Sequence, residues 1–168
     1  MRIYKIHGEE IIQHFKKVEM IVTSTSPFTM YRGNLDIEDL GQGEYRVSTD
    51  NDISNFKFTS SDEFGLDFNI TKIVVKNLSG ITSLNNSFTN LWELTEFICP
   101  FELTSDITDF EHAWSFCNSL TLFPSIDVSS GTNFRYTWYN CSALPHCPGG
   151  NEVTIPAGAT TTNMCSGI

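Results

Sequence analysis

Cysteine and histidine residues in the second half of the chain are the first candidates for chemistry, because both bind metals and both can act in catalysis. Cys141, His146 and Cys147 cluster, but their spacing matches no closed zinc pattern, and the sequence contains no Cys-x-x-Cys. Cys117 and Cys141 lie 24 residues apart, at equivalent places in two copies of a repeat. We expect them to be small buried side chains that point in parallel, an awkward arrangement for a disulfide. The sequence therefore predicts no metal site and no cofactor.

Catalysis has little support among the other polar residues. The chain contains no His-Glu-x-x-His, no Gly-x-Ser-x-Gly, no P-loop and no dinucleotide-binding fingerprint. None of the four histidines has a sequence partner that would make it a general base. The acid pairs Glu93/Glu96 and Asp106/Asp109 could flank a glycosidic bond, but an acidic chain supplies such pairs by default. A carbohydrate-active enzyme is thus the weakest of three hypotheses, and we predict that the protein is not an enzyme.

An internal repeat in the second half of the chain must position these residues. Residues 81–97, 107–123 and 131–147 superimpose, with periods of 26 and 24. The shared template is Leu or Phe, then Phe or Trp four residues later, then Leu or Cys, Leu, and Phe or Cys at intervals of three. This spacing wraps the chain once around an apolar interior, so each unit buries its face only against the next.

Each repeat is expected to place one short strand in a parallel sheet, with neighbouring strands about 4.8 Å apart. The expected strands are Leu94–Phe97, Leu120–Phe123 and Leu144–Cys147. Incomplete copies flank the three repeats, as is common for terminal units. The opening copy places Phe64, Asp67, Ile70 and Ile73 at template positions. The closing copy is Gly158–Ile168, with Cys165 in the place of Trp114 and Trp138.

Two of the repeats resemble the BspA-like leucine-rich repeats of bacterial surface antigens, a type also named after Treponema pallidum, with the core Ala-Phe-x-x-Cys-x-x-Leu. The match lies in residues 113–120 and 137–144, where Trp replaces Phe, and the first repeat departs from it by placing Leu91 at the Cys position. Phrases such as residues 123–134 also look like those in predicted tail and virion proteins of bacteriophages. The resemblance implies a leucine-rich-repeat solenoid that binds through its surface.

The first sixty residues contain no repeat and predict a small, mostly β unit. Turn signals at Arg32-Gly33-Asn34 and Gly41-Gln42-Gly43 separate short β-prone runs. The expected strands are 2–6, 17–24, 28–32, 44–49 and 56–60. One helix is expected over Glu9–Lys17, because apolar residues recur there at helical spacing, with acids in the first turn and lysines in the last.

The predicted fold class is mainly β with short helical or irregular segments. A β-rich docking unit, residues 1–60, precedes a leucine-rich-repeat array with a parallel sheet, residues 61–168. Within the array, residues 61–80 and 158–168 are the end caps, and the repeats cover 81–106, 107–130 and 131–157. A single continuous domain is the alternative, in which the first unit packs directly onto the first repeat.

Charge and hydropathy exclude several classes of partner. The net charge is −10, and residues 81–168 hold eight acidic residues against one basic residue, Arg135. Nucleic acids and anionic membrane surfaces both require clustered Lys and Arg. The sequence has no apolar run near the ~18 residues of a membrane span and no signal peptide at its start. We predict no nucleic acid, no membrane insertion, and a location in a virion or otherwise in the cytoplasm.

A non-enzymatic attachment protein unites these features best, for example a tail, fibre or capsid-decoration component of a bacteriophage virion. Residues 1–60 would contact other proteins of a larger assembly, while the repeats present a surface to a protein or a glycan. The main alternative is a soluble intracellular protein that binds and regulates or inhibits another protein. The candidate binding residues are Thr95, Glu96, Thr121, Leu122 and His146 on the strand wall, and Arg135, Tyr136 and Tyr139 on the other wall.

Overall fold

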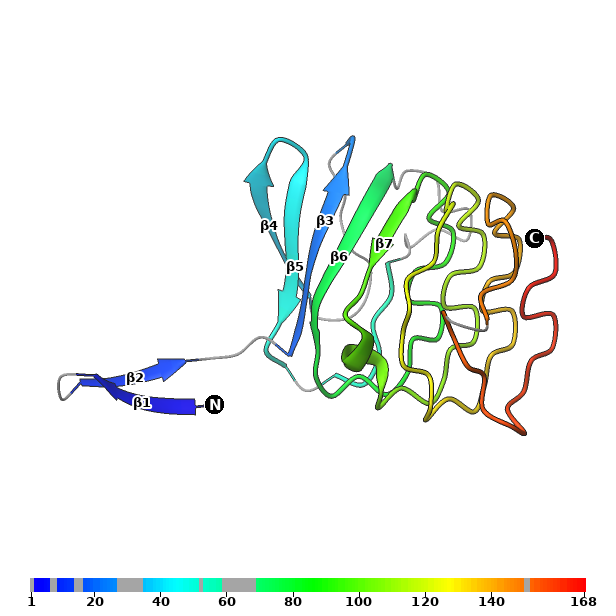
Figure 1. Ribbon diagram of the computed structural model, residues 1–168. Helices are drawn as coiled ribbons and strands as arrows, with labels where there is room; N and C mark the ends of the chain where they lie inside the picture. The colour runs from blue at the N-terminus through cyan, green and yellow to red at the C-terminus, as the bar shows by residue number, and fades with distance from the viewer. Residues whose placement is uncertain are drawn as a thin grey trace.

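The computed structural model describes residues 2–6, 9–13, 17–26, 35–51, 53–58, 69–149 and 152–168 (Figure 1). The strands are β1 (Arg2–Ile6), β2 (Glu9–Gln13), β3 (Val18–Ser24), β4 (Asp36–Gly41), β5 (Glu44–Thr49), β6 (Ile70–Leu78) and β7 (Glu96–Ile98). One short 3-10 helix, η1 (Phe101–Thr104), follows β7. The prediction of a mainly β protein with short helical and irregular segments is confirmed.

Five of the strands form one mixed sheet in the order β4-β5-β3-β6-β7 (Figure 1). Neighbours from β4 to β6 are antiparallel, whereas β7 lies parallel to β6. Alternating burial explains why these runs are strands, since Val18, Met20 and Val22 of β3 and Val47 of β5 all point into the core. The sheet joins strands from the first sixty residues to strands from the repeat half.

Most of the strands expected in the first sixty residues are present. The strands predicted at 2–6, 17–24 and 44–49 are confirmed as β1, β3 and β5, whereas β4 was not predicted. The turn at Gly41-Gln42-Gly43 is confirmed, and a Cβ at Gly43 would lie only 2.6 Å from the Ser24 carbonyl oxygen. Residues 56–58 form no strand. The strand at 28–32, the Arg32-Gly33-Asn34 turn and residues 59–60 lie outside the described residues.

The helix predicted over Glu9–Lys17 is wrong where the structure describes this segment. Glu9–Gln13 is strand β2, which pairs antiparallel with β1 from Arg2↔Gln13 to Ile6↔Glu9. A helix of only nine residues is marginal in water, because nucleating it is unfavourable. The β2 backbone instead gains inter-strand hydrogen bonds with its neighbour, and this pairing overrides the helical spacing of the apolar residues. Residues 14–16 of the predicted helix lie outside the described part of the chain.

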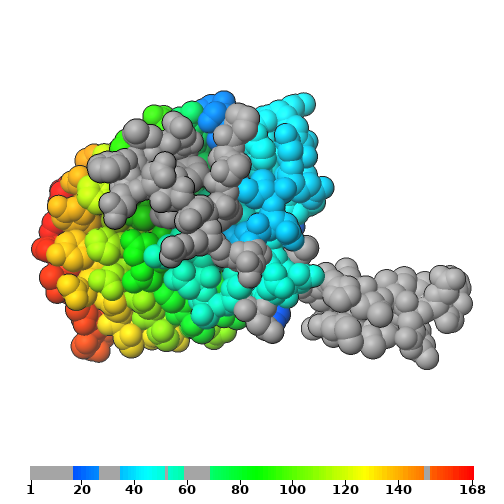
Figure 2. Space-filling view, turned by 180° about the vertical axis from the view of Figure 1, so that it is seen from behind, coloured from blue at the N-terminus to red at the C-terminus, as the bar shows by residue number. Residues whose placement is uncertain are grey.

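From residue 81 onward, successive stretches of chain lie side by side as layers, visible as bands in Figure 2. The segments 83–90, 109–116, 133–140 and 160–167 of these layers are joined by backbone hydrogen bonds, and we name them the ladder segments. Leu84 N donates to Asp109 O (2.8 Å), Phe110 N to Asn133 O (2.8 Å), and Phe134 N to Thr160 O (2.7 Å). The bridged residues Ser83, Asp109, Asn133 and Thr160 are 26, 24 and 27 apart. The first two offsets equal the periods of the sequence template.

Aromatic rings fill the interior of the layers. Phe88, Trp114 and Trp138 are fully buried and stack with centroid separations of 5.8 and 6.0 Å. Phe97 and Phe123 meet this stack edge-on, with Phe123 4.8 Å from Trp114 and 5.1 Å from Trp138. Stacked and edge-to-face pairs are the favoured geometries of aromatic rings. The template positions that carry Phe or Trp therefore interlock from one layer to the next.

The start of the stack uses residues from before the repeats. Phe58 N donates to Ser87 O (2.8 Å), and the Phe58 ring stacks on Phe88 at 5.7 Å. On the sheet side, Ile73 of β6 pairs with Phe97 of β7, 24 residues later. Ile70 and Ile73 of the predicted opening copy are thus both buried in β6, while Phe64 and Asp67 lie outside the described residues.

Of the three predicted parallel strands, the described residues contain only one, displaced along the chain. β7 covers Glu96–Ile98, whereas the prediction was Leu94–Phe97, and the segments Leu120–Phe123 and Leu144–Cys147 form no strand. For the second of these segments the physical reason is Pro145, because proline lacks the N–H that a sheet partner needs. Pro124 follows the first of these two segments, Pro145 lies inside the second, and Pro148 follows it. The leucines still point into the core, so these segments pack without strand pairing.

Trp114→Ala tests the importance of the aromatic stack. Removing this buried ring should lower the free energy of unfolding by about 3–5 kcal/mol, measured by urea denaturation. Trp114→Phe should be much milder, because Phe88 fills the same place in the first layer and because the Trp114 Nε1 has no hydrogen-bond partner among the described residues. Trp92→Ala is the control, since Trp92 is 46% exposed. Equal losses in Trp114→Ala and Trp92→Ala would contradict the interlocked core.

Candidate binding surfaces

The strand wall holds the first group of predicted binding residues. Thr95 and Glu96 are exposed, but both contact β6: Thr95 Oγ1 donates to Thr71 O (3.0 Å), and Glu96 forms an ion pair with Lys72 (2.8 Å). These contacts tie β7 to the sheet. The visible role of the two side chains is therefore to support a parallel strand pair at its exposed face.

Thr121, Leu122 and His146 lie together, without Thr95 and Glu96. They line a shallow pocket of about 40 Å³, in which Leu122 is 70% exposed. One water molecule occupies ~30 Å³ of liquid. The pocket is thus too small for a ligand, although the exposed Leu122 side chain can contribute to a contact surface.

The second predicted group lies on the face formed by the ladder segments, which we call the ladder wall. Its side chains link neighbouring layers. Tyr136 stacks on His112 of the preceding layer at 4.7 Å and accepts a hydrogen bond from Asn163 Nδ2 of the next layer (3.1 Å). Tyr139 meets Tyr136 edge-on at 5.4 Å, and Arg135 lies 3.8 Å from Glu111. Tyr136 and Tyr139 are half-buried, whereas Arg135 is exposed. These contacts stiffen the wall and leave only part of each ring for a partner.

A polar network beside these rings explains one of the acid pairs. Asp109 Oδ2 accepts from Ser83 Oγ (3.2 Å), and Asp109 Oδ1 accepts from Asn133 Nδ2 (2.9 Å) and from the backbone N–H of Glu111 (3.1 Å). The Asp109 carboxylate therefore joins three layers and closes a local turn. This role is structural, so the pair Asp106/Asp109 needs no substrate to account for it.

The layers also carry a groove that the sequence did not predict. It has a volume of about 570 Å³, within the range of roughly 300–1,000 Å³ that is usual for ligand sites. Its lining residues come from three consecutive layers: Phe101, Ser125, Ile126, Asp127, Val128, Ser129, Glu152, Val153, Thr154 and Pro156. Asp127 N donates to Phe101 O (3.1 Å) and Ile126 N donates to Glu152 O (3.3 Å), so the three stretches are adjacent.

Unequal segment lengths produce this groove. Between the last template position and the start of the next repeat, the first layer has nine residues (98–106), the second has seven (124–130) and the third has ten (148–157). The short middle segment forms the floor, where Ile126 and Val128 are buried, and the longer neighbours rise on both sides. This difference in length is readable from the repeat alignment and is the signal that could have located the groove.

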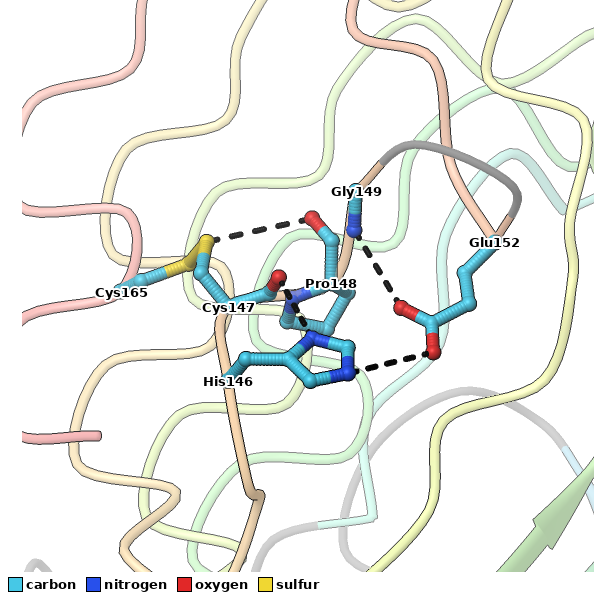
Figure 3. The surroundings of a disulfide bond; sticks show 6 residues. All are labelled: His146, Cys147, Pro148, Gly149, Glu152 and Cys165. Atoms are coloured by element: carbon cyan, nitrogen blue, oxygen red, sulfur yellow. Dashed lines mark hydrogen bonds and ion pairs between the residues drawn. A yellow bond between two sulfur atoms is a disulfide. The ribbon is translucent and has the colours of Figure 1, made fainter.

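The groove is apolar with two carboxylates. Phe101 is 52% exposed at one side. Asp127 Oδ1 accepts from the Ser129 N–H (2.9 Å), and Glu152 Oε2 accepts from the Gly149 N–H (3.3 Å). The other oxygen of Glu152 lies 3.8 Å from His146 Nε2, as Figure 3 shows. Both carboxylates are held in place by the backbone, and neither belongs to the acid pairs that the sequence suggested.

The cysteines divide into buried thiols and one disulfide. The predicted buried side chains at Cys117 and Cys141 are confirmed: both are free, and their Sγ atoms donate to Phe88 O (3.2 Å) and Trp114 O (3.0 Å). Burial raises the pKa of the Cys117 thiol well above its usual value and that of Cys141 to about 12. A thiol so protonated is a poor nucleophile and a poor metal ligand.

Cys147 and Cys165 form a disulfide (Figure 3) that the sequence left open. Cys147 occupies the template position of Phe123, and Cys165 occupies that of Trp138. In the preceding layer pair these positions hold the edge-on contact between Phe123 and Trp138. The disulfide therefore takes the place of an aromatic contact between these two template positions.

The described residues contain no group of three His, Cys, Asp or Glu side chains that could hold a metal ion. No helix in the described ranges has the length and hydrophobicity that a membrane crossing requires. Comparison with known proteins finds no match to a family model, to a curated protein or to a solved structure. The resemblance to BspA-like repeats consequently stays a prediction from the sequence.

His112→Asn tests the electrostatics of the ladder wall. Burial lowers the pKa of His112, with Glu111 opposing the shift and Arg135 adding to it. Because the unfolded chain keeps a pKa of about 6.5, it binds protons more readily, and His112 should reduce stability as pH falls through that value. Asn86 and Asn163 adopt the same positive φ as His112 (56°, 51° and 54°), so the backbone accepts Asn. The loss of melting temperature between about pH 7 and 5.5 should be smaller in the variant; equal losses would contradict this account.

Removing the disulfide tests the closing layer. The bond closes a loop with a sequence separation of 18, so Cys147→Ser/Cys165→Ser should lower the free energy of unfolding by about 2–3 kcal/mol. Limited proteolysis should then cut within residues 148–168 first. Reduction with dithiothreitol should have the same effect on the unmodified protein and none on the variant. An unmodified protein that is insensitive to dithiothreitol would rule out a stabilising disulfide.

Proposed function

We propose that this protein is a non-enzymatic attachment component that presents a preformed surface on its stacked layers. The layers form a short leucine-rich-repeat solenoid, and the β-rich unit of residues 1–60 contacts a larger assembly such as a bacteriophage virion. The repeat template and its resemblance to phage tail and virion arrays motivate this setting. The partner on the layers is a protein or a glycan, and the groove is the principal contact site.

One observation carries the proposal, namely the ligand-sized groove on a scaffold with little freedom to move. Its floor and both sides belong to layers that are linked by the backbone ladder and by the Phe88, Trp114 and Trp138 stack. A preformed site avoids the entropy of ordering a loop on binding. The same rigidity supports attachment in preference to a mechanism that needs a moving lid.

Binding without chemistry is supported by the state of the polar groups. Asp127 and Glu152 accept backbone hydrogen bonds, and the thiols of Cys117 and Cys141 are protonated and buried. Among the residues that line the groove there is no histidine, cysteine or lysine to act as a base or a nucleophile. These groups are suited to recognition of a partner by charge and shape.

Cross-linking mass spectrometry of particles purified from the source of the protein tests the setting. Four of the six lysines lie in residues 1–60, and the other two are Lys72 and Lys76 of β6. An amine-reactive reagent therefore reports on the first unit and β6, and a carboxylate-reactive reagent reaches the layers as well. We expect amine cross-links from residues 1–60 to an assembly protein. In isolated particles we expect few carboxylate cross-links from the layers. An unrelated acidic protein, added in equal amount before purification, controls for adsorption.

The alternatives correspond to other outcomes of the same work. Absence from the particles, with stable binding to one soluble protein, would favour a regulator or inhibitor in place of a virion component. Turnover of a polysaccharide by the purified chain, lost in Asp127→Asn, would overturn the non-enzymatic proposal. Asp106→Asn is the matched control for that measurement, because Asp106 is exposed and does not line the groove.

A further inference from the structure

We infer that the groove binds a peptide segment of a partner protein that carries an aromatic or aliphatic side chain next to a lysine or arginine. This inference rests on the proposed function and names the ligand class of its principal contact site. Three features of the groove lead to it, namely an exposed ring, two carboxylates with no lysine or arginine among the lining residues, and a length that crosses three layers.

Phe101 supplies the apolar part of the site. Its ring is 52% exposed at the side of the groove, beside the floor residues Ile126 and Val128, which are almost fully buried, as is Val153 of the next segment. Aromatic side chains at the margin of a preformed recess are common anchors of protein interfaces. A partner side chain placed against Phe101 would remove both apolar surfaces from water, which is favourable.

Asp127 and Glu152 supply the charge. No lysine, arginine or histidine is among the residues that line the groove. The one basic residue of the layers, Arg135, lies on the ladder wall beside Glu111. The exposed His146 lies 3.8 Å from Glu152 and can form an ion pair with it only when protonated. Asp127 has no lysine, arginine or histidine beside it among the lining residues, so a partner lysine or arginine would complement the groove.

The extent of the groove favours a peptide over a small cation. Its lining residues span three layers, and paired backbone segments stack about 4.8 Å apart, so the groove runs over roughly 10 Å. An extended chain advances about 3.3 Å per residue. About three residues of a partner segment fit along this length. Adjacent side chains of an extended chain point to opposite faces, so the apolar side chain lies against the floor while the long, flexible stem of the neighbouring lysine or arginine bends back to a carboxylate.

An NMR titration of the full, ¹⁵N-labelled chain at low salt tests the inference with three synthetic peptides. They are Gly-Lys-Phe-Lys-Gly, its acidic counterpart Gly-Glu-Phe-Glu-Gly, and Gly-Lys-Gly-Lys-Gly. We expect the first peptide alone to shift the amides of residues 125–129 and 152–154 strongly. Asp127→Asn/Glu152→Gln should weaken its binding about tenfold, because both amides keep their backbone contacts but lose the charge. Phe101→Ala should weaken it to a similar extent, about tenfold.

Matched controls separate the groove from the rest of the surface. Asp106→Asn removes an exposed carboxylate outside the groove, and Trp92→Ala removes an exposed ring outside it, so both should leave binding unchanged. Equal binding of the three peptides, shifts confined to the ladder wall, or no shift at any concentration would each overturn the inference. If the peptides do not bind but the unmodified chain still joins its particle through cross-links in residues 1–60, attachment stands and the peptide specificity of the groove alone fails.

Discussion

Backbone hydrogen bonds between ladder segments are the interaction on which the rest of this molecule depends. Alternate amides of one segment donate to carbonyl oxygens of the next, and the bridged residues of successive segments are 26, 24 and 27 apart. Equivalent positions in neighbouring layers are thereby held in register. Phe88 must then face Trp114, and Trp114 must face Trp138, so burial of the rings and pairing of the backbone reinforce each other. The surface pairs His112/Tyr136 and Asp109/Asn133 follow from the same register.

Freedom to vary remains where this ladder does not reach. The segments 98–106, 124–130 and 148–157 differ in length, although the ladder segments between them do not. The groove lies where a shorter segment sits between two longer ones, and backbone hydrogen bonds from Asp127 N to Phe101 O and from Ile126 N to Glu152 O join the three segments.

The Cys147–Cys165 bond shows that the same template accepts a different kind of contact. One layer pair places Phe123 against Trp138, and both rings are buried. In the next pair the equivalent residues are Cys147 and Cys165, and a covalent bond replaces the packing. A disulfide stabilises by constraining the unfolded chain and does not rely on buried area.

The sequence by itself determined the mainly β class, the strands at β1, β3 and β5, and the register of the repeats, because alternation and a recurring apolar template are local and periodic signals. It also placed Cys117 and Cys141 in the core. Only the tertiary structure decided what depends on partners: β2 became a strand by pairing with β1, and two predicted strands stayed unpaired. The tertiary structure also places Thr121, Leu122 and His146 around one small pocket, and Thr95 and Glu96 do not line it. The groove arose because three segments of unequal length were stacked on one rigid ladder, and that juxtaposition exists only once the chain has folded.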